Sequence, residues 1–519
     1  MSRRLLLALE LLVILVAGLQ VWEIGQVTWA RLAFGYDIEW MEGATLLSGL
    51  RAHEGLPFYT LPQIDYIPFI YPPVYAWLLG GLGYLFPIGY ALGRSVSVVG
   101  TLVAAAALVF GAREAGARWA LAIGCGALFL GTYEDAGTFY DLVRIDGLSI
   151  GILAWAWVVA VGGTPRRAIL GGLLLALAFT TKHHAAIFGF PIGLVLWRRS
   201  GVRHAALFAA AAVVPALVFT VSLQLATGGL FLTYLLEVPS SHGMVVDRLL
   251  PWVTVKLSPQ FSFRSGGALL ECVKAAPLVW LLAVLQPRWA RAPGGAYWLA
   301  VGVVAVVTVS LMRGHTGGFV NVLIPLLWVQ SLLPALVARA AAELRPWMIH
   351  VVTGLVAVQL WQGRADLRSY APTPEDQAAG DALIDTLRSL PEPMLIPHAP
   401  YYAVLAGKAP SISLICLWDI NHPGGPLVGG VARVRKAMRT QHWATIVLPD
   451  DKLGYDLKEG YVRSKDLGKR TFGTRTGWAV RLRQVWSPKP GGAARPAAAE
   501  SPESPESPES PADPSTAAE

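Results

Sequence analysis

Three acidic residues follow closely after the first apolar run of the chain, in the segment GYDIEWMEGA. They are Asp37, Glu39 and Glu42. If that run crosses a membrane, carboxylates at the bilayer surface lose solvation, which raises their proton affinity and suits a general base or a metal ligand. Asp37 and Glu39 share a face in extended backbone, so they are the candidate catalytic residues and the candidate ligands of a Mg²⁺ or Mn²⁺ ion. Alternatively, the acids are a solvated cap at a helix start, where they favour the helix dipole.

A basic cluster, Lys182, His183 and His184, ends the apolar run 168–182. A helix of 15 residues is only about 22 Å long, whereas the hydrocarbon core of a bilayer is about 30 Å thick. The cluster is therefore predicted to lie below the membrane surface and to line a cavity that receives an anion. The alternative is a lysine that extends to the lipid headgroups. Two adjacent histidines do not make a zinc site by themselves.

Two further segments place charged residues at the ends of apolar runs. Arg144 and Asp146 stand in YDLVRIDGLSIG, where an arginine suits a phosphate but a helix cap with a neighbouring anchor explains the pair equally well. Arg313, His315 and Asn321 stand in LMRGHTGGFVNV and are candidates for a second contact with a phosphate or a sugar.

The elements that must position these residues are apolar helices. The chain has 519 residues, of which 54 % are hydrophobic and only 15 % are charged, whereas soluble domains carry roughly 25 % charge. This composition excludes a water-soluble globule and predicts a polytopic α-helical membrane protein. About eleven transmembrane helices are predicted, one within residues 5–30 and the others near 91–112, 119–133, 146–163, 168–182, 184–197, 204–226, 268–286, 295–312, 318–338 and 346–362.

Arginines predict the orientation of these spans. With the N-terminus in the cytoplasm, the cytoplasmic loops are those with arginines at positions 113 and 118, 166 and 167, 198 to 203, 288 and 291, and 339 and 345, as the positive-inside rule requires. Residues 73–87 then do not cross, and 227–267 form either an amphipathic interfacial helix or a lid. All candidate residues face the extracytoplasmic side. The net charge of +8 indicates contact with anionic lipid and not with nucleic acid.

The chain divides into three parts by composition. Residues 1–362 form the transmembrane module. Residues 363–487 are predicted to form a small extracytoplasmic α/β domain, with an amphipathic helix in PTPEDQAAGDALIDTLRSL, a basic helix in VARVRKAMRTQ and strands in PMLIPH and WATIVLP. Residues 488–519 are a Pro/Ser/Glu repeat that cannot bury a core and is predicted to be disordered.

Four short motifs, YDIEWMEGA, YPPVYAWLLG, RID and LAFTTKHH, occur in an order that resembles the GT-C superfamily. The similarity covers about residues 1–340, and it is to the branch of protein O-mannosyltransferases and lipid A aminoarabinose transferases. These are membrane glycosyltransferases that use polyprenyl-phosphate-linked sugars. The resemblance implies that Asp37 or Glu39 is the catalytic base or a metal ligand, and that Arg144 and Lys182 hold the lipid phosphate.

Two classes of function fit this pattern. The first is an inverting glycosyltransferase of the plasma or inner membrane, which moves a sugar from a polyprenyl-phosphate donor to a glycan, lipid or protein acceptor. Asp37 and Glu39 would act on the acceptor, while Arg144, Asp146, Lys182, His183, Arg313 and His315 would bind substrate. The alternative is a flippase or transporter of lipid-linked saccharide, whose charges would mark a translocation path. A scaffold that displays the C-terminal domain needs neither the acids nor a recessed lysine.

Overall fold

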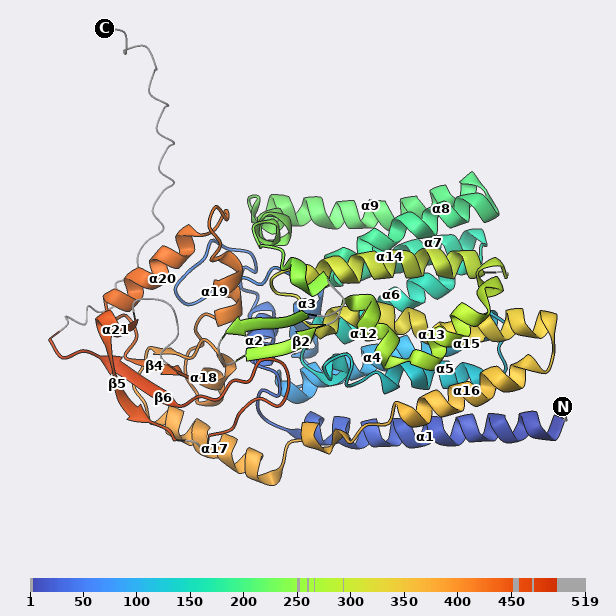
Figure 1. The fold of residues 1–519 in the computed structure, drawn as a ribbon. Helices are drawn as coiled ribbons and strands as arrows, with labels where there is room; N and C mark the ends of the chain where they lie inside the picture. The colour runs from blue at the N-terminus through green and yellow to red at the C-terminus, as the bar shows by residue number, and fades with distance from the viewer. Residues whose placement is uncertain are drawn as a thin grey trace, which may run out of the picture.

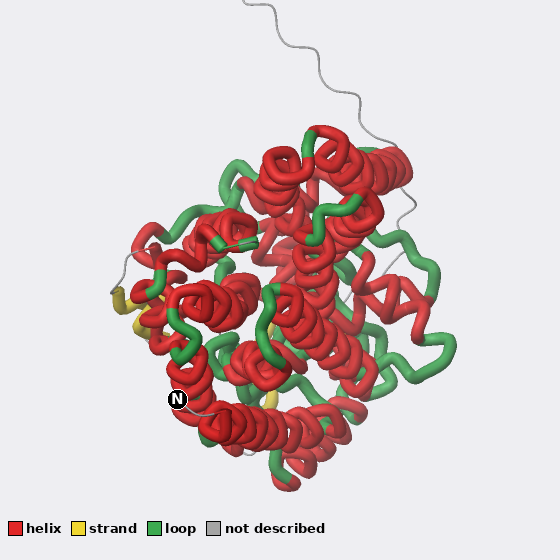
Figure 2. The backbone as a smooth tube through the Cα atoms, turned by 90° about the vertical axis from the view of Figure 1, so that its right-hand side faces the viewer, coloured by secondary structure: helices red, strands yellow, loops and turns green. Residues whose placement is uncertain are grey.

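The computed structural model describes residues 3–249, 253–258, 261–265, 267–292, 294–450, 457–468 and 471–491. Most of the chain is a bundle of helices that run side by side, with the N-terminus at one end and the elements from α17 onward at the opposite end (Figure 1). Viewed along the bundle, the helices appear in cross-section as closely packed coils (Figure 2). The helices of the bundle are α1 (Arg3–Ala33), α4 (Tyr90–Glu114), α5 (Trp119–Gly131), α6 (Ile145–Val161), α7 (Pro165–Thr181), α8 (Gly189–Ser200), α9 (Val202–Ala226), α12 (Ala268–Ala275), α13 (Pro277–Leu285), α14 (Gly295–Gly314), α15 (Ile324–Leu344) and α16 (Met348–Gln362).

Each predicted apolar run lies in a helix or in a broken pair of helices, but the predicted number of spans is not confirmed. By length and composition, five helices of the described chain are long and apolar enough to cross a membrane: Arg3–Ala33, Tyr90–Glu114, Val202–Ala226, Gly295–Gly314 and Val320–Leu344. The pair α12 and α13, bent by 99°, would be a sixth. Several other apolar helices, such as α5, α6 and α16, have fewer than 18 residues.

Helix α15 is almost entirely buried among the others. Its Trp328 donates a hydrogen bond of 2.8 Å to the carbonyl of Ala104 in α4. Helices α4 and α6 can approach closely because Gly100 has no side chain. A Cβ atom at this position would lie only 2.4 Å from the carbonyl oxygen of Gly147. This contact fixes the start of α6, where Ser97 donates a hydrogen bond of 2.9 Å to the carbonyl of Arg144.

The end of the bundle opposite the N-terminus carries the short elements. They are α2 (Glu42–His53), α3 (Val74–Leu82), η1 (Phe139–Asp141), η2 (His183–Phe188), α10 (Leu230–Leu232), η3 (Thr233–Glu237), α11 (Val238–Ser240), η4 (Val246–Leu249) and η6 (Val320–Leu323). The backbones of β1 (Val253–Ser258) and β2 (Phe261–Ser265) pair as an antiparallel hairpin. Residues 227–267 are therefore not one amphipathic helix, and their role as a lid stays a prediction.

The C-terminal elements form a mixed four-stranded sheet with helices around it (Figure 1). The strands, in their order across the sheet, are β3 (Met394–Leu395), β4 (Thr445–Leu448), β6 (Gln484–Pro488) and β5 (Tyr461–Asp466). Strand β3 is parallel to β4, and the other pairs are antiparallel. The two predicted helices and the two predicted strands are present as α17, α20, β3 and β4, whereas β5 and β6 were not predicted. The repeat that was predicted to be disordered lies almost entirely outside the described residues. The elements are α17 (Pro374–Arg388), β3 (Met394–Leu395), α18 (Tyr401–Leu405), α19 (Leu414–Ile420), α20 (Gly429–Arg439), β4 (Thr445–Leu448), α21 (Leu457–Gly460), β5 (Tyr461–Asp466) and β6 (Gln484–Pro488).

Candidate functional site

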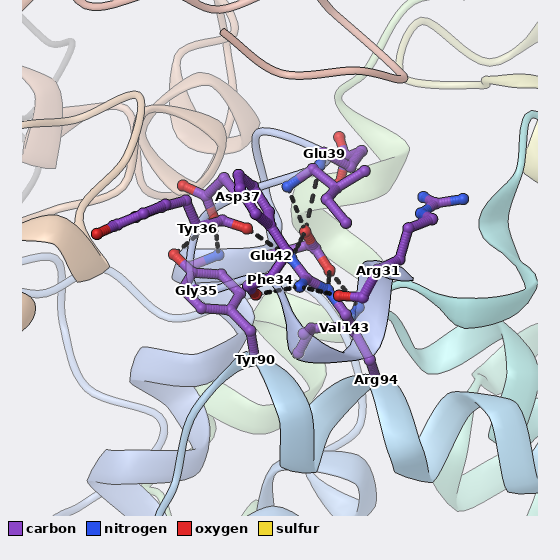
Figure 3. A network of polar contacts seen from close by, with 12 residues as sticks. Arg31, Phe34, Gly35, Tyr36, Asp37, Glu39, Glu42, Tyr90, Arg94 and Val143 are labelled. Carbon is purple, nitrogen blue, oxygen red and sulfur yellow. Dashed lines mark hydrogen bonds and ion pairs between the residues drawn. The ribbon is translucent and has the colours of Figure 1, made fainter. Parts of the chain in front are cut away.

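A buried ion pair organises the acidic segment that follows α1 (Figure 3). Both carboxylate oxygens of Glu42 accept hydrogen bonds from the guanidinium of Arg94, at 2.9 and 2.8 Å. Glu42 also accepts from the backbone N–H groups of Ile38 at 2.7 Å and Val143 at 2.8 Å. Burial by itself would raise the pKa of Glu42, but Arg94 and these donors outweigh it and hold the pKa below its ordinary value. Glu42 is therefore an ionised anchor. The other acceptors of Arg94 are the carbonyls of Arg31, Phe34 and Tyr36.

Asp37 is held in place by hydrogen bonds to three parts of the chain. Its Oδ1 accepts from the N–H of Gly43 at 2.8 Å and from the hydroxyl of Tyr90 at 3.0 Å. Its own N–H donates to the hydroxyl of Tyr402 in α18 at 3.3 Å. Burial and the nearby charge of Glu42 raise the pKa of Asp37 well above its ordinary value. Asp37 is thus a buried carboxyl that favours the protonated state.

Glu39 begins a chain of buried charges that crosses the end of the bundle. Its Oε2 lies 3.5 Å from Nη1 of Arg144. Nε of Arg144 lies 4.0 Å from Oδ2 of Asp146, whose Oδ1 lies 2.8 Å from Nζ of Lys182. The amide of Asn321 donates a further hydrogen bond of 3.0 Å to Asp146. All four charged side chains are buried. The predicted residues Glu39, Arg144, Asp146 and Lys182 are therefore brought together, although they come from three separate segments: the loop after α1, the start of α6 and the end of α7.

Asp37 and Glu39 do not share a partner. Glu39 accepts from the N–H of Met41 at 3.2 Å and faces Arg144, whereas Asp37 faces Gly43 and Tyr90. The backbone bends at Ile38, so the extended conformation that would put both carboxylates on one face is not present. The expectation that they act on one ligand from a common face is therefore not supported by the geometry.

Two further ionisable groups adjoin the Glu39–Lys182 chain. The phenol of Tyr71 and the carboxylate of Asp419 in α19 both interact electrostatically with Arg144. Burial raises the pKa of Glu39 to about 7 in spite of Arg144, and burial likewise raises the pKa of Asp419 to about 7. Both carboxylates can therefore take up and release a proton near neutral pH, which a general base requires.

The other predicted substrate-binding residues lie beside this chain and not within it. His183 follows Lys182 directly and interacts electrostatically with His315. Nη1 of Arg313 donates a hydrogen bond of 2.8 Å to the carbonyl of Gly318, within its own loop. The ring of His315 lies 4.9 Å from the ring of His242, centroid to centroid. From this loop, it is Asn321 that reaches the charges around Asp146.

Asp37 and Glu39 do not fit a metal ion as a pair. Among the described residues, no group of three or more His, Cys, Asp and Glu side chains is arranged to hold a metal. Oδ2 of Asp37 is buried without a hydrogen-bond partner in the described chain, but Glu39 faces the cation Arg144. The requirement for Mg²⁺ or Mn²⁺ stays a prediction.

Three residues of this region were not predicted as functional. Arg94 could have been suspected, because it is a lone arginine near the start of an apolar run. Tyr71 lies within the quoted motif YPPVYAWLLG, but its type and spacing do not distinguish it from an aromatic anchor. Asp419 lies 275 positions after Arg144 (419 − 144), in a segment without a recognisable motif. Nothing in the local sequence predicts its contact with the site.

Comparison with known proteins supports the fold. No protein-family model and no curated protein sequence matches the chain. Among solved structures, it is similar to ArnT from Cupriavidus metallidurans, a GT-C lipid A aminoarabinose transferase, bound to undecaprenyl phosphate. The TM-score is 0.56 at 13 % identity, over 93 % of this chain and 99 % of that chain. For the apo state of the same protein the TM-score is 0.54 at 14 % identity, over 93 % and 98 %. The resemblance predicted from the four motifs is confirmed at the level of the fold.

Proposed function

We propose that this protein is a membrane glycosyltransferase that moves a sugar from a polyprenyl-phosphate donor to an acceptor on the extracytoplasmic face. The observation that carries the proposal is the buried chain Glu39–Arg144–Asp146–Lys182 at one end of an ArnT-like bundle. It combines a carboxylate that titrates near pH 7 with two cations. The ArnT structure bound to undecaprenyl phosphate supports a lipid of this class as the donor.

Lys182 and Arg144 are the groups proposed to hold the donor phosphate. Asp146 lies between them, 2.8 Å from Nζ of Lys182 and 4.0 Å from Nε of Arg144, and keeps both cations in position without ligand. A phosphate brings more negative charge and more acceptor oxygens than this one carboxylate, so it competes for the same donors. The polyprenyl chain would remain in the lipid, and the sugar would face the Glu39 side.

Glu39 is the group proposed to act as the general base. It removes the proton from an acceptor hydroxyl, the acceptor oxygen forms a bond to the anomeric carbon, and the bond from that carbon to the phosphate oxygen breaks. The leaving polyprenyl phosphate takes the electron pair, and Lys182 and Arg144 stabilise its growing charge. In-line attack inverts the configuration at the anomeric carbon. Asp37 is proposed to position the loop, because its carboxyl is engaged by Gly43 and Tyr90.

The test is release of lipid phosphate by the purified protein. The protein is incubated with a panel of undecaprenyl-phosphate monosaccharides and a membrane fraction as acceptor. We expect Glu39→Gln to abolish transfer and to retain binding of undecaprenyl phosphate, and Lys182→Met to lose that binding. Glu54→Gln, which changes an exposed acid at the end of α2, is the matched control and should keep full activity. Full transfer by Glu39→Gln would refute the mechanism. Lipid movement across vesicles without transfer would favour the flippase.

A further inference from the structure

Three tryptophans converge beside the proposed catalytic carboxylate. The rings of Trp418 and Trp478 are stacked, with centroids 5.1 Å apart and an interplanar angle of 28°. The rings of Trp40 and Trp478 meet at 86° with centroids 5.2 Å apart, and the centroid of Trp40 lies 5.9 Å from that of Trp418. Trp40 comes from the acidic loop, whereas the other two come from the C-terminal elements. The cluster therefore forms only when these two parts of the chain meet.

The sequence neighbours of these tryptophans are groups of the candidate site. Glu39 directly precedes Trp40, and Asp419 directly follows Trp418. The third tryptophan follows Gly477, where a Cβ atom would lie 2.9 Å from Cγ of Glu39. Gly477 also has a φ of +70°, which other residues rarely adopt. The chain before Trp478 thus passes directly over Glu39 and places the aromatic cluster beside it.

The exposed part of this cluster is Trp418. Its side chain is 39 % exposed, whereas Trp40 is 8 % exposed. The carboxylate of Asp419 accepts no hydrogen bond from the described residues, although it interacts with Arg144 across the site. An accessible indole that adjoins a half-buried carboxylate in the sequence suits a ligand that has apolar C–H faces and hydroxyl groups. A sugar ring offers both, since its C–H face packs on an aromatic ring while its hydroxyls donate to carboxylates.

We infer that Trp418, Trp478 and Asp419 form the acceptor subsite, and that the acceptor is a saccharide. This inference rests on the proposed function. One acceptor sugar stacks on the indole of Trp418, its hydroxyls donate to Asp419, and the hydroxyl that is to be glycosylated points to Glu39. The donor occupies the Arg144 and Lys182 side, so the two substrates meet at Glu39 from opposite sides.

Binding of neutral trisaccharides to the purified full-length protein tests this subsite. Saturation-transfer difference NMR with maltotriose and mannotriose as probes should show transfer to the sugar-ring protons. Trp418→Ala should weaken binding about tenfold, the loss of one stacking surface, whereas Trp418→Phe should keep most of it. Trp119→Ala changes a tryptophan that is 63 % exposed at the other end of the bundle, and this variant should bind the trisaccharides as the wild type does. Retained binding of undecaprenyl phosphate checks that each tryptophan variant is folded.

The outcome separates this inference from the proposed function. Lys182→Met should lose undecaprenyl phosphate and keep trisaccharide binding. If no variant affects lipid phosphate binding but Trp418→Ala loses the sugar, the donor site is wrong and the acceptor subsite stands. The subsite is overturned if neither trisaccharide binds. It is equally overturned if Trp418→Ala binds as the wild type does, or if a Ser/Thr peptide competes for the site and the sugars do not.

Discussion

The charge of Arg144 should set the proton affinity of Glu39, and replacing it tests whether Glu39 is the base. The two groups are 3.5 Å apart and both are buried, so solvent screening is weak. A pair of unit charges at about 4 Å interacts with about 4 kcal/mol at an effective dielectric constant of about 20. Because one pKa unit corresponds to about 1.4 kcal/mol, this interaction is equivalent to about three units at most.

Arg144→Gln should therefore move the midpoint of Glu39 upward. Arg144 stabilises the ionised form of Glu39, so its removal raises the pKa from about 7 to between about 8 and 10. The lower limit allows for Lys182, which remains near the site and compensates part of the lost charge. A base is active when deprotonated, so transfer in this variant should begin to rise only at higher pH than in the wild type.

Infrared difference spectroscopy during a pH titration measures this midpoint without substrate. The C=O band of the protonated carboxylic acid is assigned to Glu39 by its loss in Glu39→Gln. Arg144→Lys keeps the positive charge and should stay within about one unit of the wild type. A midpoint in Arg144→Gln equal to that of the wild type, or below it, would refute the assignment of Glu39 as a carboxylate controlled by this arginine.

Four further results are expected. Glu42→Gln or Arg94→Met leaves one buried partner uncompensated and should lower the free energy of unfolding by about 3 to 5 kcal/mol, seen as an earlier thermal transition in detergent; an unchanged transition would contradict the anchor role. Gly477→Ala should lower transfer at unchanged lipid phosphate binding, because a Cβ atom would displace Glu39. In intact cells, Ser464→Cys in β5 should react with a membrane-impermeant maleimide and Ser200→Cys at the end of α8 should not. The reverse labelling pattern would show that the orientation in the membrane is opposite to the predicted one. EDTA should lower transfer if the predicted metal dependence holds, and full activity in EDTA would end that prediction.

The burial of Lys182 agrees with a prediction made from length alone. A run of 15 apolar residues is shorter than the hydrocarbon core is thick, which predicts that its last residue lies below the membrane surface, and that depth stays a prediction. In the structure α7 ends at Thr181, and Lys182 is buried. The sequence predicts a substrate anion as the partner of Lys182. In the described chain its partner is the carboxylate of Asp146, a residue that the sequence also predicts to bind substrate.

The partners of the acidic residues could not be predicted because they are distant in the sequence. Glu42 pairs with Arg94, 52 positions away. Local patterns determine which residues form a helix, but they do not determine which helix ends meet. The separation of Asp37 from Glu39 has the same origin, because Glu42 binds the backbone N–H groups of Ile38 and Glu39 and bends the segment between the two carboxylates.

The C-terminal elements belong to the site, and this follows from what holds the acidic loop. The carbonyl of Ile38 accepts hydrogen bonds from the N–H groups of Arg475 at 2.9 Å and Thr476 at 3.1 Å, so the residue between Asp37 and Glu39 is fixed from the C-terminal side. From the bundle side, Arg94 and Glu42 fix the same segment. Composition divides the chain at residue 362, yet the proposed base lies where the two parts meet. If the acceptor subsite is as we infer, separating these parts would remove the acceptor subsite and misplace the proposed base together, while the cations proposed to bind the phosphate would remain in the bundle.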